Sequence, residues 1–284
     1  MAAPARRAVW RRVSPAPGQV MDLLHARVTE SYAPHVHEVY GVGVCTEGRE
    51  VIGYRGERHY AGRGDVVILE PGEPHTGGPT EPGGFVYRVM CPAAELLSGL
   101  AGSQTMPRFR EPVIDDPQLA AELSLVHAML SHRLEAQRLE AQRFEAETRL
   151  SWVFGELVRR HATWQPPALR LPAGRVAPVV MAQLADQLSC PPGLGQIAAE
   201  AGLSRYQLVR SFRAEVGMPP YAWLAQHRVA RARTLLEQGC RPAEAAMLTG
   251  FADQAHLTRW FRRVVGVTPA VYRNSVQDSR IASG

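Results

Sequence analysis

The chain has 284 residues, enough for two domains, and 45% of them are apolar, as is usual in folded proteins. Its four cysteines, Cys45, Cys91, Cys190 and Cys240, lie far apart, which excludes zinc fingers and a disulfide framework. The basic residues 1–12 are not followed by an apolar run, and no stretch approaches the ~18 apolar residues of a membrane span. We therefore expect a soluble, cytoplasmic protein with no membrane partner.

The basic residues are unevenly distributed, and all 32 of them are arginines. From residue 175 to the end, 13 arginines stand against 7 acidic residues, a net charge of +6, whereas residues 1–174 carry −1. A GC-rich genome would explain the missing lysines but not this asymmetry. The positive excess indicates a polyanionic partner for the C-terminal part.

Residues 1–18 form a basic N-terminal arm. Two interpretations stay open for it: a mobile arm that reports on ligand binding, or a disordered tail. Its arginines and its aromatic residue are Arg6, Arg7, Trp10, Arg11 and Arg12.

Residues 19–92 have the pattern of a small β domain. Short apolar or alternating segments are separated by turns that contain glycine, which predicts a sandwich or barrel. We also expect a glycine- and proline-rich loop at 71–84. The clearest predicted strands are 39–45, 50–54 and 65–69.

Residues 93–162 are predicted to form a helical pair. Leu119, Leu123 and Val126 begin one apolar stripe, which Leu130 and Leu134 continue. The tandem repeat LEAQRLEAQR at 134–143 has a five-residue step, which turns about 500° around a helix. Its leucines therefore cannot share one face, and we expect a solvated helix extension there. Apolar spacing resumes at Leu150, Val153, Phe154, Leu157 and Val158. Because the barrel or a second subunit must cover these faces, we expect a dimerisation segment; dimer against monomer stays open.

A proline-rich linker is predicted at 163–177, and helices are predicted beyond it. Within this last part the chain repeats itself. A shift of 49 residues superimposes Leu208 on Leu257, Phe212 on Phe261 and several further pairs. These further pairs are Arg210 with Arg259, Arg213 with Arg262, Gly217 with Gly266 and Pro220 with Pro269.

Each copy has the pattern of a helix-turn-helix. A first helix ends at Gly202 or Gly250, and a second helix begins at a capping residue. That residue is Ser204, in an S-x-x-Q capping box, or Asp253. One long helix at 221–237 is predicted to join the copies and to hold the two second helices ~34 Å apart, one turn of DNA.

The second helix of each copy is predicted to turn its leucine and phenylalanine inward and its polar side chains outward. Arginine and glutamine can read guanine and adenine edges in the major groove, although such residues often form only a solvated face. The expected outward residues are Tyr206, Gln207, Arg210, Arg213, Gln254, His256, Arg259 and Arg262.

The segment ending in GFADQAHLTRWFRRVVGVTPAVYR resembles the AraC/XylS family of bacterial transcription regulators. The resemblance covers residues 178–275 and implies seven helices in two subdomains, bound to double-stranded DNA. Ala255 departs from the expected chemistry, because it offers only a methyl contact. The family's contacting face falls on Arg205, Tyr206, Gln207, Arg210, Gln254, Ala255, His256 and Arg259.

The pattern PHVHE at 34–38 with a later histidine is similar to the cupin domains that AraC-type regulators use to sense effectors. Three interpretations stay open for His35, His37 and His75: structural residues, lining of an effector site shared with Tyr54, or metal ligands. The glutamate expected near residue 41 or 42 is absent, and Glu38 should point to the opposite face. We expect no cofactor.

These inferences predict an α+β chain of two domains: a cupin-like β-barrel with a helical segment, then an all-α double helix-turn-helix and a tail at 276–284. The expected function is effector-modulated, sequence-specific transcription regulation rather than catalysis. The expected partners are operator DNA, a small-molecule effector and a second copy of the chain, with RNA polymerase as a further candidate. The alternatives are a metal-dependent cupin enzyme and a regulator that works through protein contacts alone.

Overall fold

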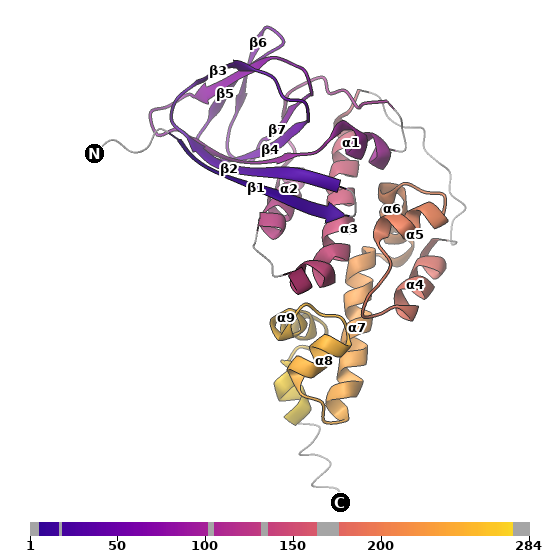
Figure 1. Cartoon of the computed structure of the whole chain (residues 1–284). Coiled ribbons are helices and arrows are strands. Elements are labelled where there is room, and N and C mark those ends of the chain that lie inside the picture. Colours follow the sequence, from indigo (N-terminus) through magenta and orange to yellow (C-terminus); the bar gives the residue numbers. More distant parts are fainter. Residues whose placement is uncertain (1–5, 17–18, 102–104, 132–135, 164–175, 275–284) are drawn as a thin grey trace, which may run out of the picture. The chain divides into compact units, whose positions relative to one another are not determined.

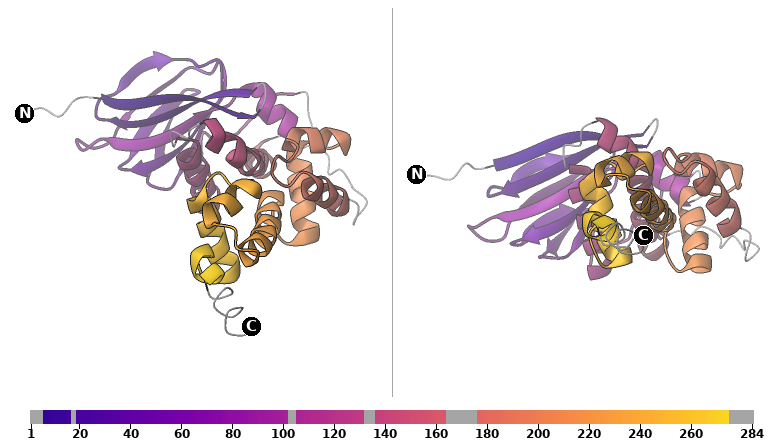
Figure 2. Two further views of the ribbon diagram at one scale, coloured as in Figure 1. Left: turned by 60° about the horizontal axis from the view of Figure 1, so that its bottom comes forward. Right: turned by 90° about the horizontal axis from the view of Figure 1, so that it is seen from below.

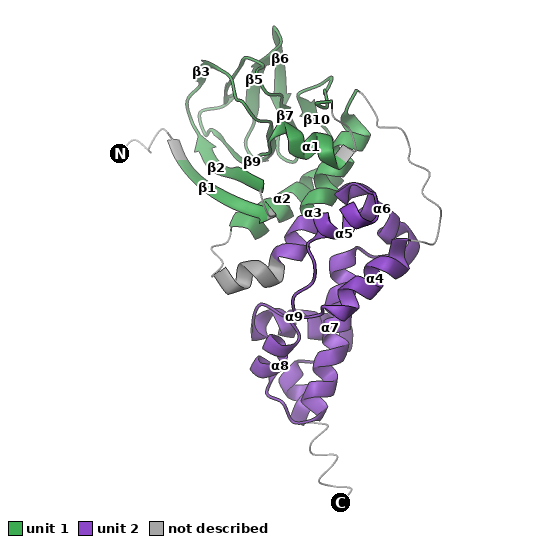
Figure 3. Ribbon diagram, turned by 45° about the vertical axis from the view of Figure 1, so that its right-hand side comes forward, with its two compact units in different colours: residues 1–133, 149–169 green, residues 134–148, 170–284 purple. Residues whose placement is uncertain are grey.

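The structure is a computed structural model that describes residues 6–16, 19–101, 105–131, 136–163 and 176–274. It divides into two compact units, residues 1–133 with 149–169 and residues 134–148 with 170–284 (Figure 3). The first unit is β-rich and the second is helical, so the predicted α+β class is confirmed.

The described strands of the first unit form two antiparallel sheets (Figures 1 and 2). In spatial order the larger sheet contains β1 (Arg6–Ala16), β2 (Gln19–Val28), β9 (Phe85–Cys91), β4 (Gly41–Glu47), β7 (Val66–Leu69) and β10 (Val113–Ile114). The smaller sheet contains β3 (Tyr32–His35), β8 (His75–Pro79), β5 (Glu50–Tyr54) and β6 (Glu57–Ala61). Side chains of both sheets line one cavity, so the sheets face each other.

The three clearest predicted strands are confirmed as β4, β5 and β7. Between β5 and β6, Arg55 and Gly56 both have positive φ, 51° and 84°. Two successive residues of this kind match the right-handed twist of a hairpin, which explains why a glycine stands there.

Two parts of the β domain differ from expectation. Residues 6–16 pair with β2 as strand β1, so this part of the arm is a strand of the larger sheet rather than a disordered tail. The predicted loop at 71–84 contains strand β8, which pairs with β3 and β5. The strand was not predicted because its glycines are unusual within strands. A Cβ at Gly77 would lie 2.2 Å from the Tyr32 hydroxyl oxygen, so this position requires a residue without a side chain.

Helices α1 (Ala94–Ala101), α2 (Pro117–Ser131) and α3 (Ala136–His161) follow the strands. The helical pair is confirmed, and its apolar stripe at Leu119, Leu123 and Val126 is buried. Helix α2 contacts β1, β4 and β9, so the barrel covers it. Leu134 and the side chains of residues 135–142 of the tandem repeat lie outside the described residues.

The second unit contains α4 (Val176–Asp186), α5 (Leu194–Glu200), α6 (Arg205–Val216), α7 (Pro220–Glu237), α8 (Pro242–Leu248) and α9 (Gln254–Val265). A further helical segment at 269–274 brings the helices described between residues 176 and 274 to seven. Helix α4 begins inside the predicted linker, because Val176 and Ala177 are buried. None of the helices described in either unit is long and apolar enough to span a bilayer.

Candidate functional site

Both predicted helix-turn-helix copies are present, as α5–α6 and α8–α9 on either side of α7 (Figure 1). The first helix of each copy ends at a glycine with positive φ, 67° at Gly202 and 76° at Gly250. Glycine, which has no Cβ, adopts this backbone conformation at little cost, so the chain can turn sharply into the second helix.

Helices α6 and α9 begin directly after the predicted capping residues, Ser204 and Asp253. Ser204 Oγ accepts a hydrogen bond from Gln207 N at 3.2 Å, and Gln207 Oε1 accepts one from Ser204 N at 2.9 Å. Asp253 Oδ1 accepts from His256 N at 2.6 Å. Each cap satisfies an N–H group that has no partner within its helix.

The inward faces of α6 and α9 are also as predicted. Leu208 and Phe212 of α6 are completely buried, and so are Leu257 and Phe261 of α9. Burial of a phenylalanine or leucine side chain contributes about 1.5–3 kcal/mol, so these positions fix the rotation of each helix about its axis.

The opposite faces carry exposed polar side chains. Arg210 and Arg213 are exposed on α6. On α9 the exposed residues are Gln254, Ala255, Arg259, Arg262, Arg263 and Val264. Each of the two helices therefore presents exposed arginines, the side chains that suit contact with a phosphate backbone.

Two residues expected on these faces are not exposed, and their predicted orientation was wrong. Tyr206 is 5% exposed and His256 is 6% exposed. Val209 and Trp260, each buried one turn further along, widen the apolar stripe by about one residue, so it includes Tyr206 and His256. Burial, with Arg259 and Arg228 nearby, lowers the pKa of His256 to about 4, so its ring is neutral at pH 7.

Gln207 and Arg205 lie at the edge of the α6 face. Both are half-buried, and the Gln207 side chain is engaged in its capping box. The Arg205 guanidinium lies against α5, because a Cβ at Gly195 would stand 2.7 Å from Arg205 Nη2. Arg210 and Arg259 are therefore the residues of the predicted contacting face that present an exposed guanidinium.

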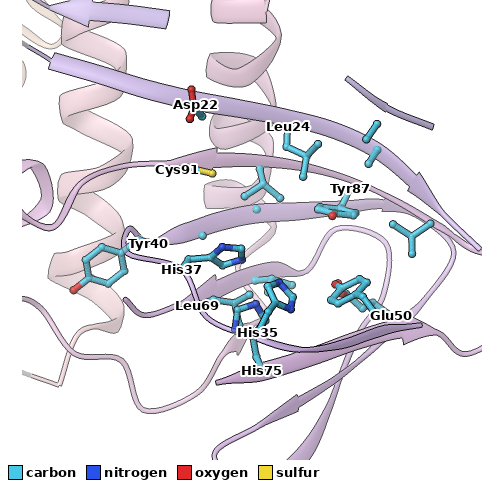
Figure 4. A pocket seen from close by; sticks show the side chains of 18 of the residues that line it. Asp22, Leu24, His35, His37, Tyr40, Glu50, Leu69, His75, Tyr87 and Cys91 are labelled. Atoms are coloured by element: carbon cyan, nitrogen blue, oxygen red, sulfur yellow. The ribbon is translucent and has the colours of Figure 1, made fainter. Parts of the chain in front are cut away.

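The first unit holds a cavity of about 560 Å³ between its two sheets (Figure 4). Its walls are mainly apolar and include Leu24, Leu69 and Val89. Polar groups converge from the smaller sheet and from the segment after β3: His35, His37, His75, Glu50 and Tyr32. A mainly apolar cavity with a few polar groups is the usual form of a small-molecule site.

The three predicted histidines come together at this cavity. His35 and His75 are cross-strand partners on β3 and β8, with ring centroids 4.4 Å apart. The His37 ring lies 4.8 Å from His35 and 4.9 Å from His75. Their candidate ligand atoms all lie within 4.8 Å of one another.

In two of the histidines, hydrogen bonds fix which ring nitrogen carries the proton. His35 Nδ1 lies 3.0 Å from Ala33 O, and His75 Nδ1 lies 3.0 Å from Glu73 O. Because a carbonyl oxygen only accepts, both Nδ1 atoms donate, and each neutral ring keeps an unprotonated Nε2. Burial lowers the pKa of His37 and of His75, which favours neutral rings. Neutral imidazoles oriented by backbone carbonyls fit a divalent metal ion as well as a polar ligand.

Glu50 is the cavity residue that sequence reasoning missed. It is 5% exposed, and its Oε1 accepts a hydrogen bond from the Tyr32 hydroxyl at 2.6 Å. Burial raises the pKa of Glu50 to about 7, although the Tyr32 bond opposes this rise. Strand alternation offered the signal, since Glu50 shares the inward face of β5 with Ile52 and Tyr54.

Tyr54, which we expected beside the histidines, does not line the cavity. It is 3% exposed and packs with Ile52 and Ala61, and its hydroxyl accepts from Glu70 N at 3.4 Å. The prediction of an effector-lining role for Tyr54 was therefore wrong. The tyrosines that do line the cavity are Tyr32, Tyr40 and Tyr87; Tyr32 lies on β3, which β8 separates from β5.

Two known families match these units. The family described as an AraC-like ligand binding domain matches residues 19–153, and the one described as a helix-turn-helix domain matches residues 197–275. The chain belongs to the AraC family. It is an AraC-type DNA-binding transcription regulator with a ligand-binding domain.

Several known proteins are similar to this chain or to part of it. The chain is 26% identical to the uncharacterized HTH-type transcriptional regulator YbfI of Bacillus subtilis, over 81% of this chain and 82% of that protein. It is 36% identical to the HTH-type transcriptional regulator RipA of Corynebacterium glutamicum, over 40% of this chain and 35% of that protein. Among solved structures, the DNA-binding domain of AdpA in complex with a target DNA is 34% identical, covering 36% of this chain and 92% of that chain, with a TM-score of 0.34.

Proposed function

We propose that this AraC-type protein binds an operator through α6 and α9, and that a small molecule in the cavity between the two sheets sets its affinity for that operator. The observation that carries this proposal is the cavity of about 560 Å³ with its converging His35, Glu50 and Tyr32. Its ligand is bound rather than transformed. The base and phosphate contacts come from Arg210 and Arg259, supported by Arg213, Gln254 and Arg262.

A chain of contacts in the first unit supports communication from the cavity. Leu69 lines the cavity, and the next residue, Glu70, is 1% exposed. Glu70 accepts hydrogen bonds from Phe109 N and from Arg108 Nη1, both at 2.6 Å. Phe109 in turn forms a β-bridge with Ala162, directly after α3. A ligand that moves β7 would therefore bear on the end of α3.

The other end of α3 supports the second half of this route. Residues 134–148 group with the helical unit, and Glu147 Oε2 accepts a hydrogen bond from Leu194 N at the start of α5. One helix thus contributes residues to both units. Coupling through it would be seen as reciprocal effects of ligand and DNA on each other's affinity.

A thermal-shift screen of the full chain against metabolites tests the ligand, because a molecule that binds only the folded state raises its melting temperature. Each hit is then added to a gel-shift assay on the gene's own upstream region with excess competitor DNA. We expect one preferred fragment, and a hit that changes its affinity several-fold. Tyr32→Phe should weaken this response, whereas Tyr60→Phe on exposed β6 should not. Absence of a preferred fragment, or a hit that leaves DNA affinity unchanged, contradicts the proposal.

The histidine geometry favours a second candidate occupant, a divalent metal ion held by His35, His37 and His75. Metal analysis of the purified chain, repeated on His37→Ala, tests it. A stoichiometric ion lost in that variant, but kept in His59→Ala, supports the ion. An equal ion content in all three proteins contradicts it and leaves the histidines as polar lining.

We also propose that the regulator acts as a homodimer and that RNA polymerase is a partner at the promoter. Edge strand β1 supports the dimer, because its Val9 and Trp10 are 45% and 58% exposed. Sedimentation of the full chain tests the dimer, and a single species of monomer mass would contradict it. Transcription with purified polymerase on the preferred fragment tests the second partner.

A further inference from the structure

A second pocket, of about 350 Å³, lies on the first unit between the larger sheet and α2. It shares no lining residue with the cavity between the sheets. Its lining consists of Val9, Arg11, Leu23, His25, Arg88, His127, Ala128 and Ser131.

Strand register places the basic residues of this pocket on one face of the sheet. Arg11 pairs with Leu23, and His25 pairs with Arg88. Cross-strand partners point to the same face, and successive residues alternate between faces. The neighbours of these residues, such as Trp10 and Leu24, line the cavity on the other face. The pocket is therefore on the outer face, where α2 covers it.

The pocket is positively charged without compensation from its own lining. Arg11 and Arg88 form no hydrogen bond or ion pair with an acidic side chain in the described part of the chain, and none of the lining residues is acidic. Glu47 is close enough to raise the pKa of His25, but it is paired with Arg27 at 2.5 Å. Burial lowers the pKa of His25, and the charge of Arg88 adds to this lowering.

The α2 side of the pocket is neutral and polar. His127 Nε2 lies 3.0 Å from Leu24 O and therefore donates to it, which leaves Nδ1 to accept from Ser131 Oγ at 3.2 Å. Burial lowers the pKa of His127 to about 4, so its ring carries no charge at pH 7. This arrangement ties α2 to β2 and leaves the two guanidinium groups as the charged groups of the site.

We propose that this pocket binds a small oxyanion, the phosphate or carboxylate group of a metabolite, between Arg11 and Arg88. Planar guanidinium groups match the paired oxygens of phosphate and carboxylate. Arg11 on β1 and Arg88 on β9, with β2 between them, both line this pocket, so an anion in it can meet both positive charges. The site is distinct from the effector cavity and does not depend on the role proposed for it. Its occupant would strengthen the contact between β1, β9 and α2.

Titration of the full chain with potassium phosphate, pyrophosphate and citrate, each at the ionic strength of a potassium chloride control, tests this site. We expect a saturable rise in melting temperature with at least one of the three oxyanions. Arg88→Gln and Arg11→Gln should each weaken the apparent affinity at least tenfold. Arg88→Lys, which keeps the charge but not the fork, should retain part of it.

Arg58→Gln, an exposed arginine of β6, is the matched control for lost charge. A response to phosphate or pyrophosphate alone identifies a phosphate ligand, and a response to citrate alone identifies a carboxylate ligand; either result supports the site. A shift equal to that of chloride, or an equal loss in Arg58→Gln, overturns the proposal. If Arg88→Gln fails to fold, Arg11→Gln and Arg88→Lys decide the outcome, because Arg11 is exposed.

Discussion

The two helix-turn-helix copies have the same core but differently built edges. Leu208 and Phe212 of the first copy match Leu257 and Phe261 of the second in position and in complete burial. Beyond these pairs, however, the buried stripes differ: the first copy buries Tyr206, which the 49-residue shift matches to exposed Ala255, and the second buries His256, which it matches to half-buried Gln207. The two copies therefore keep the same rotation of the second helix about its axis, which the core residues fix, while the residues around each core vary.

The largest expected effect is common to both copies. Phe212→Ala and Phe261→Ala should each lower the free energy of unfolding by about 3–5 kcal/mol, because each leaves a cavity in a packed core. Denaturant unfolding of the full chain measures this. Val271→Ala, at a position 52% exposed, is the control and should cost less than about 0.5 kcal/mol. A cost below 1 kcal/mol for either phenylalanine would show that its copy is not packed as described.

The next largest effect is a loss of stability at acid pH, which we expect from the second copy because it buries His256. The pKa of His256 falls from 6.5 to about 4 on folding, so the unfolded chain binds its proton first as the pH falls. Stability from this group is present above pH 6.5 and is lost between pH 6.5 and 4, by about 2 kcal/mol at pH 5. His256→Gln, the residue that the first copy has at the matching position 207, should remove that part of the acid sensitivity. Equal loss between pH 7 and pH 5 in both proteins would contradict a buried, neutral His256.

The smallest effect compares the caps. Ser204→Ala removes one side of a reciprocal capping box, and Asp253→Ala removes a single carboxylate cap. Each should cost about 0.5–2 kcal/mol in thermal or denaturant unfolding. Asp253→Asn, which keeps an acceptor oxygen, should recover most of its loss. If the asparagine variant is as unstable as the alanine one, the cap does not work through its hydrogen bond.

The sequence predicted the helical unit well because its signals are local. Gly202 and Gly250 follow the ends of the first helices, Ser204 and Asp253 cap the second ones, and α7 begins one residue before its predicted start at 221. The strands β4, β5 and β7 were predictable for the same reason, since alternation and turn glycines are read within a few residues.

What the sequence could not predict depends on contacts between distant segments. Strand β8 is formed because β3 and β5 flank it, and Gly77 is required by Tyr32, which lies 45 positions earlier in the chain. Glu50 enters the cavity through the same sheet. Tyr206 and His256 were misplaced because a narrow stripe was assumed where Val209 and Trp260 make a wide one.

The most direct test of the account is a set of affinities that pairs each arginine with its own half of the operator. Wild-type protein, Arg210→Ala and Arg259→Ala are each titrated with the preferred fragment and with versions in which one half-site or the other is scrambled. We predict that each variant loses about 1–3 kcal/mol of binding and becomes indifferent to scrambling of one half-site only, a different half for each arginine. Uniform weakening on all fragments, or dependence of both variants on the same half-site, would contradict the assignment of two separate reading helices.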